Sequence, residues 1–482
     1  MSPQLILLVF LSYTALLFVV SFITSRKANN QSFFVGNKKS PWFVVAYGMI
    51  GASLSGVTFI SVPGWVGKTQ FSYMMVVLGY IVGYYVIAYV LLPLYYKLKL
   101  TSIYSYLESR FGKYSYKTGA LYFLISRIIG ASFRMFLVVN VLQIFVFDEW
   151  NIPFVFTISL FIILIWLYTF KGGIKTIVWT DTLQTTFMLL SVVISIFLII
   201  KALNINLGTL IGFVSESGYS KMVITDWHSK LFFGKQFISG AFIAIVMTGL
   251  DQDMMQKNLS CRTLKDSQKN VITLSWILVP VNLIFLFLGA SLYIFADKTG
   301  ITLPALSDNL FPAIAVKYLG TFAGITFIIG LIAAAYSSAD SALTALTTSF
   351  SVDFLGMERK KDIPEKKKIK TRTFVHIGIS VIVLITVVVF RQINDQAVIS
   401  KLFTIAGYTY GPLLGMFSFG LFTKYKVIDK FVPVVAILSP VICYFLSDNS
   451  EFLFNGYKFG FELLVVNGAL TFFGLYFIRR KI

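Results

Sequence analysis

The chain of 482 residues carries little charge, because Asp, Glu, Lys and Arg make up only 13% of it. A water-soluble protein has about twice that share, so lipid must be the solvent for most of this chain. Cysteine and histidine are also scarce, with two of each, namely Cys261, Cys443, His228 and His376. These residues lie far apart in the predicted topology, which leaves no disulfide framework and no His or Cys metal site. A phosphate-binding glycine loop is missing as well, so an ATP-driven pump is unsupported.

Apolar residues dominate instead, at 57% of the chain. Apolar stretches of roughly 20 residues recur from end to end, and each is long enough to cross the ~30 Å hydrocarbon layer as a helix. The run from Phe187 to Ile200 is apolar on nearly all sides, whereas a strand of a barrel would alternate. We therefore expect an all-α integral membrane protein with about thirteen transmembrane helices. The expected spans are residues 4–25, 42–67, 72–96, 118–147, 153–170, 176–200, 236–256, 271–296, 321–353, 373–391, 400–422, 430–447 and 459–478.

The net charge of +20 could suggest nucleic acid binding, but most of the 41 Lys and Arg residues fall in alternate loops between the expected spans. Basic loops stay on the cytoplasmic side, so the N-terminus is predicted outside and the C-terminus inside. The first span lacks a basic residue before it and is followed by Arg26 and Lys27, which indicates a retained helix and not a cleaved signal peptide. The sequence thus predicts a multi-pass protein of the cell inner membrane, in contact with membrane lipids and with no nucleic acid partner.

The expected spans divide into two units of five, at 42–200 and 236–422, which start on opposite sides of the membrane. Two five-helix units of opposite orientation are the architecture of LeuT-type transporters, in which the first helix of each unit is interrupted at the midplane. The helix at 4–25 would then be an extra N-terminal helix, and 430–478 would hold two peripheral C-terminal helices. We expect residues 1–482 to form a single membrane transport domain.

The second span shows the poor helix formers that such an interruption needs. Small and polar residues break its apolar run between Gly48 and Thr58, and Pro63 and Gly64 follow. Carbonyls freed by an unwound turn can bind a cation or a solute, although the same residues could simply let two helices pack closely. The matching helix at 236–256 gives a weaker signal.

A stripe of small polar residues marks the span at 321–353. At about 3.6 residues per turn, Ala334, Ser337, Ser338 and Ser341 share one face. Oxygen ligands of low charge suit a hard monovalent cation, and Asp340 adds a carboxylate that the bilayer makes costly. The alternative is a stripe that only packs helices.

Two further sites of charge lie inside expected spans. Asp181 could cap backbone amides or pair with a cation. Arg127 lies near the midplane and could hold an anionic solute, or it could be engaged in a structural pair with Asp181 or Asp340. Arg134 lies two turns further toward the outer surface, which makes it the weaker candidate. The segment 249–258, with Asp251 and Asp253, is interpreted as an inner-gate network or a structural cap.

Six motifs, taken in order, resemble the sodium/solute symporter family, which includes the bacterial sialic acid, proline and galactose symporters and the mammalian sodium/glucose cotransporters. The resemblance covers nearly the whole chain. The motifs are SLSGVTFISVPG from Ser53, TSIYSYLESRFG from Thr101, GGIKTIVWTDTLQ from Gly172, DQDMMQKNL from Asp251, AAAYSSADSAL from Ala333 and GYTYGPLLGMFSFGLF from Gly407.

The resemblance implies a principal sodium site made by the backbone carbonyls of Gly51, Leu54 and Ala334 with the hydroxyls of Ser337 and Ser338. A second sodium site is implied at Asp181, Asp340 and Ser341, although Asp340 stands where the sialic acid symporter has serine. Substrate contacts carried over from the sialic acid branch are Ser53, Ser55, Thr58, Tyr73 and Arg127. Val77 replaces a glutamine that helps to bind sialic acid in that branch, so the solute itself does not carry over.

The predicted function is sodium-coupled symport of a small polar solute into the cell by alternating access, with sodium as the coupling ion. The solute would be a sugar, a sugar acid such as sialic acid, or another organic acid. A proton-coupled symporter of the same fold, with Asp181 or Asp340 as proton carrier, is the alternative, and a membrane sensor is a further one. We expect no enzymatic activity and a monomeric protein.

Overall fold

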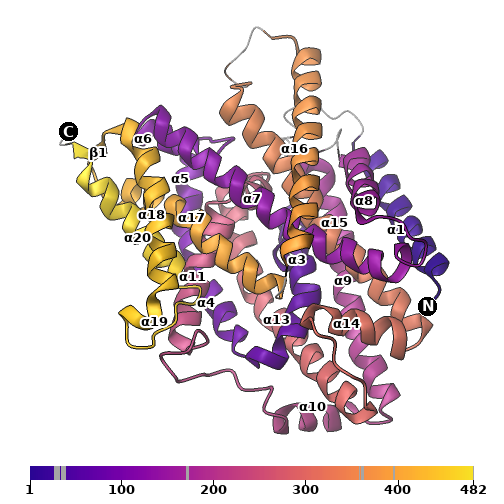
Figure 1. The fold of residues 1–482 in the computed structure, drawn as a ribbon. Helices are drawn as coiled ribbons and strands as arrows, with labels where there is room; N and C mark the ends of the chain where they lie inside the picture. Colours follow the sequence, from indigo (N-terminus) through magenta and orange to yellow (C-terminus); the bar gives the residue numbers. More distant parts are fainter. Residues whose placement is uncertain are drawn as a thin grey trace.

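The computed structural model describes residues 1–25, 33, 40–169, 173–357, 359, 363–394 and 397–480. The expected inward loop at 26–40 lies outside these residues except for positions 33 and 40. The regular secondary structure of the described residues is helical, apart from an isolated bridge between Ser40 and Cys261 and a two-residue strand pair in which β1 (Lys426–Val427) runs antiparallel to β2 (Arg479–Arg480) (Figure 1). The all-α prediction is thereby confirmed.

The first half of the chain, up to residue 216, contains α1 (Pro3–Thr24), α3 (Trp42–Thr69), α4 (Tyr73–Val86), η2 (Ile87–Leu91), α5 (Leu92–Lys97), α6 (Ser105–Arg110), α7 (Lys113–Leu142), η3 (Gln143–Phe147), α8 (Phe154–Thr169), α9 (Ile174–Ala202) and α10 (Leu207–Glu216).

The second half contains α11 (Phe233–Ala244), η4 (Ile245–Gly249), α12 (Gln252–Asn258), α13 (Leu264–Thr299), η5 (Ser307–Asn309), α14 (Leu310–Ala313), η6 (Ile314–Tyr318), α15 (Thr321–Ser349), η7 (Phe350–Phe354), α16 (Glu365–Ile393), α17 (Val398–Phe422), η8 (Asp429–Phe431), α18 (Val432–Asp448), α19 (Ser450–Leu453) and α20 (Leu463–Phe477).

Among the described residues, nine helices are long and apolar enough to cross a membrane. A tenth span forms if the helix at Phe233–Gly249 and the helix at Gln252–Asn258, which are bent by 71° to each other, are taken together. Helices α8, α17 and α20 occupy the other three expected ranges, and α8 and α20 have only 16 and 15 residues. Every expected span is therefore helical, while the number thirteen stays a prediction.

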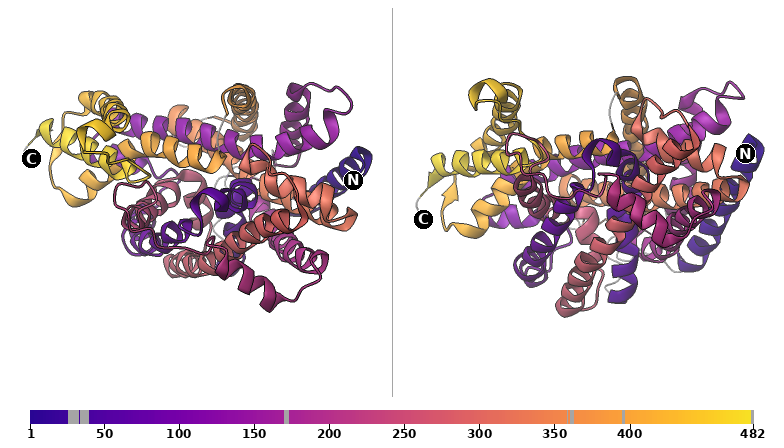
Figure 2. Two further views of the ribbon diagram at one scale, coloured as in Figure 1. Left: turned by 60° about the horizontal axis from the view of Figure 1, so that its bottom comes forward. Right: turned by 90° about the horizontal axis from the view of Figure 1, so that it is seen from below.

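The outer helices expose large apolar side chains, as a lipid-facing surface requires. Phe374, Ile377, Val381, Ile385 and Val389 lie along α16 and are each 42% to 64% exposed. Helix α1 lies at one end of the molecule, and α18 and α20 lie at the opposite end, in all views (Figures 1 and 2). The polar residues discussed below are held between these ends.

Helix α3 is the core of the molecule and packs against α9, α13 and α15. It is interrupted at Ser55, whose φ of 55° and ψ of 177° are not helical. Before this point the helix lies directly on α9, because a side chain at Gly51 would place its Cβ 2.4 Å from Thr185 Oγ1. Both interpretations of the small residues therefore hold, for different positions: Gly51 allows close packing, and the interruption falls at Ser55.

The matching helix of the second half is also broken, which the weaker sequence signal anticipated. The 71° bend falls at Leu250 and Asp251, between η4 and α12. Asp251 caps the new helix, since its Oδ1 accepts from the amides of Asp253 at 2.9 Å and Met254 at 3.2 Å. The capping interpretation of this segment is thus confirmed, and α12 is turned against α3, α9 and α15.

Candidate transport site

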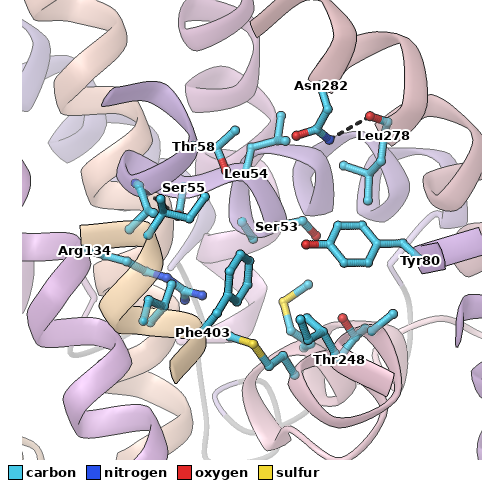
Figure 3. Close-up of a pocket in the computed structure, with 18 of the residues that line it drawn as sticks. Ser53, Leu54, Ser55, Thr58, Tyr80, Arg134, Thr248, Leu278, Asn282 and Phe403 are labelled. Atoms are coloured by element: carbon cyan, nitrogen blue, oxygen red, sulfur yellow. Dashed lines mark hydrogen bonds between the residues drawn. The ribbon is translucent and has the colours of Figure 1, made fainter. Parts of the chain in front are cut away.

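A small cavity of about 70 Å³, lined by both polar and apolar side chains, lies beside the interruption in α3. Residues 52–58 of α3 form one wall, and α4, α7, α11, α13 and α17 provide the others. In Figure 3, Arg134 and Tyr80 enter from opposite sides, and Ser53, Ser55 and Thr58 follow the broken helix. All five expected substrate contacts thus line one cavity, namely Ser53, Ser55, Thr58, Tyr73 and Arg127.

Hydroxyl groups are concentrated on one side of this cavity. The hydroxyl of Tyr73 lies 3.1 Å from that of Tyr80, and the hydroxyl of Tyr84 lies 3.4 Å from Thr248 Oγ1. Asn282 donates its amide to a carbonyl within α13, while its buried Oδ1 has no protein partner in the described structure. A ligand here would meet both donors and acceptors of hydrogen bonds.

An aromatic layer separates the central cavity from a second chamber of about 270 Å³. Phe403 lines both spaces. Its ring stacks on Tyr73 at 6.3 Å and meets Phe461 edge-on at 4.9 Å, and Trp65 lies 6.2 Å from Phe461. We call Trp65, Tyr73, Phe403 and Phe461 the aromatic layer, which lies between the two cavities.

Arg127 is engaged in ion pairs, with partners other than the expected ones. One terminal nitrogen bonds to Asp253 Oδ2, and the other lies 3.8 Å from Asp251 Oδ2. Both aspartates are fully buried, and Tyr410 donates to Asp251 at 2.5 Å. The pairs with Asp181 or Asp340 considered from sequence are therefore wrong. Arg127 ties α7 to the second broken helix, so its charge is already balanced.

Arg134 is the cation of the cavity that lacks an acidic partner. Its side chain is 6% exposed, no ion pair within 4.0 Å is found for it in the described structure, and its Nε and Nη1 have no hydrogen-bond acceptor. A buried guanidinium without an acceptor is costly, so it marks a place where an anion binds favourably. The sequence ranked Arg134 below Arg127 because depth in the span was the only criterion available.

The residues of the expected principal sodium site lie on two packed helices, α3 and α15. Ser338 Oγ donates to the carbonyls of Ala334 at 3.0 Å and Ala335 at 3.1 Å, so hydroxyl and carbonyl oxygens lie on one face of α15. Gly51 and Leu54 are buried on the segment of α3 that leads into the interruption. Hydroxyl and carbonyl oxygens, with no nitrogen or sulfur among the expected ligands, are the kind of ligand that sodium prefers, although the Ala334 carbonyl already accepts from Ser338.

The three residues of the expected second sodium site have separate partners. Asp181 accepts from Lys257 Nζ and from Ser337 Oγ, each at 2.7 Å. Ser341 Oγ lies 3.2 Å from Asp253 Oδ2 and 3.0 Å from the carbonyl of Ser337. Asp340 accepts from Tyr168 at 2.7 Å, and its Oδ1 has no protein partner in the described structure.

Lys257 was missed as a site residue because the sequence placed it at the start of an inward loop. The bend before α12 instead leaves it 1% exposed against α9. The positive charge of Lys257 was the only clue in the sequence, since a lysine buried in a membrane protein needs a partner of opposite charge. Helices broken beside a buried cavity that carries polar side chains are typical of an α-helical secondary transporter.

Comparison with known proteins gives the family. Residues 33–427 match the model of the sodium:solute symporter family, so the chain belongs to that family. It is 24% identical to the sodium/sialic acid symporter SiaT of Proteus mirabilis, over 95% of this chain and 92% of SiaT. It is 25% identical to the human sodium/iodide cotransporter, over 81% of this chain and 61% of that protein.

Solved structures show the same fold. A substrate-bound, outward-open state of a Na⁺-coupled sialic acid symporter superposes with a TM-score of 0.85, at 20% identity, over 99% of both chains. A closed conformation of Mhp1, a nucleobase-cation-symport-1 family transporter, gives 0.55 at 16% identity over 92% of both. The chain is a sodium-coupled symporter of a small solute in a membrane, as the sequence predicted.

Proposed function

We propose that this symporter carries a small organic anion, such as a sugar acid or another carboxylate, and that Arg134 holds the anionic group. The unpaired guanidinium in the cavity is the observation that supports this choice. The hydroxyls of Ser53, Tyr80 and Thr58 would bind the hydroxylated part of the solute. Two of the similar proteins are named for sialic acid, and others are sodium-coupled monocarboxylate transporters, which agrees with an acidic solute.

Arg127 contributes differently in this proposal. Its ion pairs with Asp253 and Asp251 join α7 to the broken helix beside the cavity. It therefore holds the wall of the site and touches the solute only if these pairs open during transport. Tyr73 and Ser55 shape the cavity through the aromatic layer and the interruption of α3.

Sodium would bind at the principal site, between the carbonyls of Gly51, Leu54 and Ala334 and the hydroxyls of Ser337 and Ser338. An ion at the interruption joins α3 to α15 and so favours one arrangement of these helices. The solute would then stabilise the closed packing of the aromatic layer, and the inward sodium gradient would drive release on the other side. The proposed units at 42–200 and 236–422 would move against each other around this site.

The proposed topology keeps the N-terminus outside and the C-terminus inside, in the cell inner membrane, with a monomer as the transporting unit. The chamber beyond the aromatic layer, which Ser447 at the end of α18 helps to line, then opens outward. The basic residues of the first turns of α16 then face the cytoplasm.

Uptake by the purified protein in proteoliposomes tests this function. Labelled sialic acid, neutral sugars and small carboxylates are supplied with an inward sodium gradient, or with potassium replacing sodium. We expect uptake of acids only, and only with sodium. Uptake of the labelled acid at an undiminished rate in an Arg134→Met variant would overturn the assignment of Arg134. Uptake driven by a pH gradient without sodium would instead select proton coupling.

A further inference from the structure

Asn282 is the only polar side chain of α13 that lines the central cavity in the described structure. It interrupts an apolar run, since every other residue from Ile277 to Ala290 is apolar. Its side chain is 1% exposed. An amide buried at such a position is costly in a membrane protein unless it takes part in packing or in binding. The hydrogen bonds of Asn282 distinguish between these two uses.

The orientation of this amide is fixed by its own helix. Asn282 Nδ2 donates to the carbonyl of Leu278 at 2.7 Å, one turn earlier in α13. A carbonyl oxygen only accepts, so turning the amide over would bring two acceptor oxygens together. In Figure 3 the remaining oxygen, Oδ1, lies on the side of Leu54 and Thr58 of the broken helix α3. Oδ1 is buried and has no protein partner in the described structure, so the side chain presents an acceptor that still needs a donor.

The hydrogen bond of Asn282 stays within one helix, which sets it apart from an asparagine that packs helices. Asn467 on α20 is of that second kind, because its amide donates to the carbonyls of Gly407 and Tyr408 on α17, each at 2.9 Å. Asn467 Oδ1 also lacks a partner in the described structure, but Asn467 does not line the central cavity. The distinguishing features of Asn282 are therefore its place on the cavity and the lack of a bond between helices. Packing does not explain why an amide stands there.

The charges around the cavity restrict the donor that this oxygen can accept. Neither Asp nor Glu is among the residues that line the cavity in the described structure, whereas Arg127 and Arg134 are. A buried ammonium group without an acidic partner is costly, so the cavity disfavours an amino group on the solute. A neutral hydroxyl or amide N–H carries no such cost and can donate to Oδ1.

We propose that Asn282 Oδ1 accepts a hydrogen bond from the solute and so selects acids that carry a hydroxyl or amide N–H over plain aliphatic acids. This inference rests on the proposed transport of an organic anion and narrows the solute class to hydroxy acids and acylamino acids. Arg134 on α7 and Asn282 on α13 lie on different sides of the cavity (Figure 3). The guanidinium holds the carboxylate, and the amide contacts the rest of the molecule. A hydroxylated acid supplies the missing donor, which an aliphatic acid of the same shape does not.

Equilibrium binding of matched acids to the detergent-purified protein, in the presence of sodium, tests this selection. Glucuronate and cyclohexanecarboxylate form one pair, with and without hydroxyl groups, and lactate and propionate form a smaller pair. We expect the wild-type protein to bind the hydroxylated member of a pair more tightly. A hydrogen bond between neutral groups corresponds to about a twofold to twelvefold change in Kd, so Asn282→Leu should raise the Kd of the hydroxylated acid by that factor and leave the Kd of the apolar acid unchanged.

Three further variants serve as controls. Asn282→Thr keeps an acceptor oxygen, since the new hydroxyl can donate to the Leu278 carbonyl and still accept, and it should keep the wild-type preference. Asn467→Leu removes an amide that joins two helices away from the cavity, so it should lower Tm and leave the ratio of the two Kd values unchanged. Arg134→Met should weaken both members of a pair by the same factor, because both carry the carboxylate.

The outcomes separate this proposal from the proposed function. Equal Kd values for the two members of each pair in the wild-type protein would overturn the role of Asn282 and leave the transport of an anion intact. An Asn282→Leu variant that weakens both members alike would also overturn it, because only packing would have been lost. A preference that disappears in Asn282→Thr as well would show that shape, and not an acceptor oxygen, sets the selectivity.

Failure of these four acids and of sialic acid to bind would instead refute the proposed function itself. If Asn282→Leu does not fold, the wild-type pairs and Asn282→Ala give the same comparison.

Discussion

The two arginines of α7 should respond in opposite ways to the same substitution. Arg127→Met removes the cation that balances Asp253 and Asp251, both of which are fully buried. Breaking a buried ion pair from one side costs about 3–5 kcal/mol, because the remaining charge is left without a partner. Arg134→Met removes a buried cation that has no acidic partner, so it should leave the free energy of unfolding unchanged or raise it.

For solute binding we expect the opposite ranking, with a larger effect of Arg134→Met than of Arg127→Met. A hydrogen bond between Arg134 and a carboxylate is worth about 1.5–3 kcal/mol, which corresponds to a rise in the solute Kd of about tenfold to a hundredfold in Arg134→Met. Arg127→Met, measured at a temperature where it is folded, should change the Kd much less. Arg134→Lys keeps the charge without the planar fork and should recover part of the affinity.

Two measurements on the detergent-purified protein check this pair of expectations. Thermal unfolding followed by intrinsic fluorescence gives Tm, and equilibrium binding of a labelled acid gives the Kd. The reasoning is refuted if Arg127→Met keeps the wild-type Tm and loses the solute, while Arg134→Met unfolds early and still binds it. In that case the ion pairs of Arg127 would be incidental, and its guanidinium would be the solute ligand.

Three further outcomes are expected. Gly240→Val should lower Tm, since a Cβ at Gly240 would lie 2.0 Å from the carbonyl of Val76 on α4, whereas Gly378→Val, which meets open space, should not. Burial raises the pKa of Asp308, in η5 before α14, from 3.8 to about 6. The folded protein therefore binds this proton more tightly than the unfolded chain, and stability should fall as pH rises from about 4 to 6. Asp308→Asn should flatten that part of a Tm-against-pH curve. Ser338→Ala should raise the sodium concentration needed for half-maximal uptake, and an unchanged sodium curve would exclude Ser338 as a ligand.

The sequence predicted the helices well because membrane spans are set by length and hydropathy, which are local properties. It also located the interruption in the second span and the polar face of α15 from the types of residues present. Ser55 and the bend at Leu250 lie within the segments so marked. These features follow from which residues form a poor helix or are costly in lipid.

The partners of the buried charges could not be predicted in this way. Arg127 pairs with an aspartate 126 positions away, and Lys257 with one 76 positions away. Such pairs depend on the angle at which α12 leaves the bend, and hydropathy carries no information on that angle. Depth in the span made Arg127 the better candidate for holding an anionic solute. The fold reverses this ranking, because Arg134 lacks an acidic partner in the described structure and Arg127 has two.

The backbone at Ser55 has a consequence for the speed of the cycle. A residue other than glycine with these angles carries strain of about 1–3 kcal/mol, which the surrounding helices must hold in place. Because the turn is already open in the folded protein, a sodium ion that binds there as proposed would meet carbonyls that need no unwinding first. The entropic cost of ordering that site then falls in the folding reaction, and it is not repeated when an ion binds in each transport cycle.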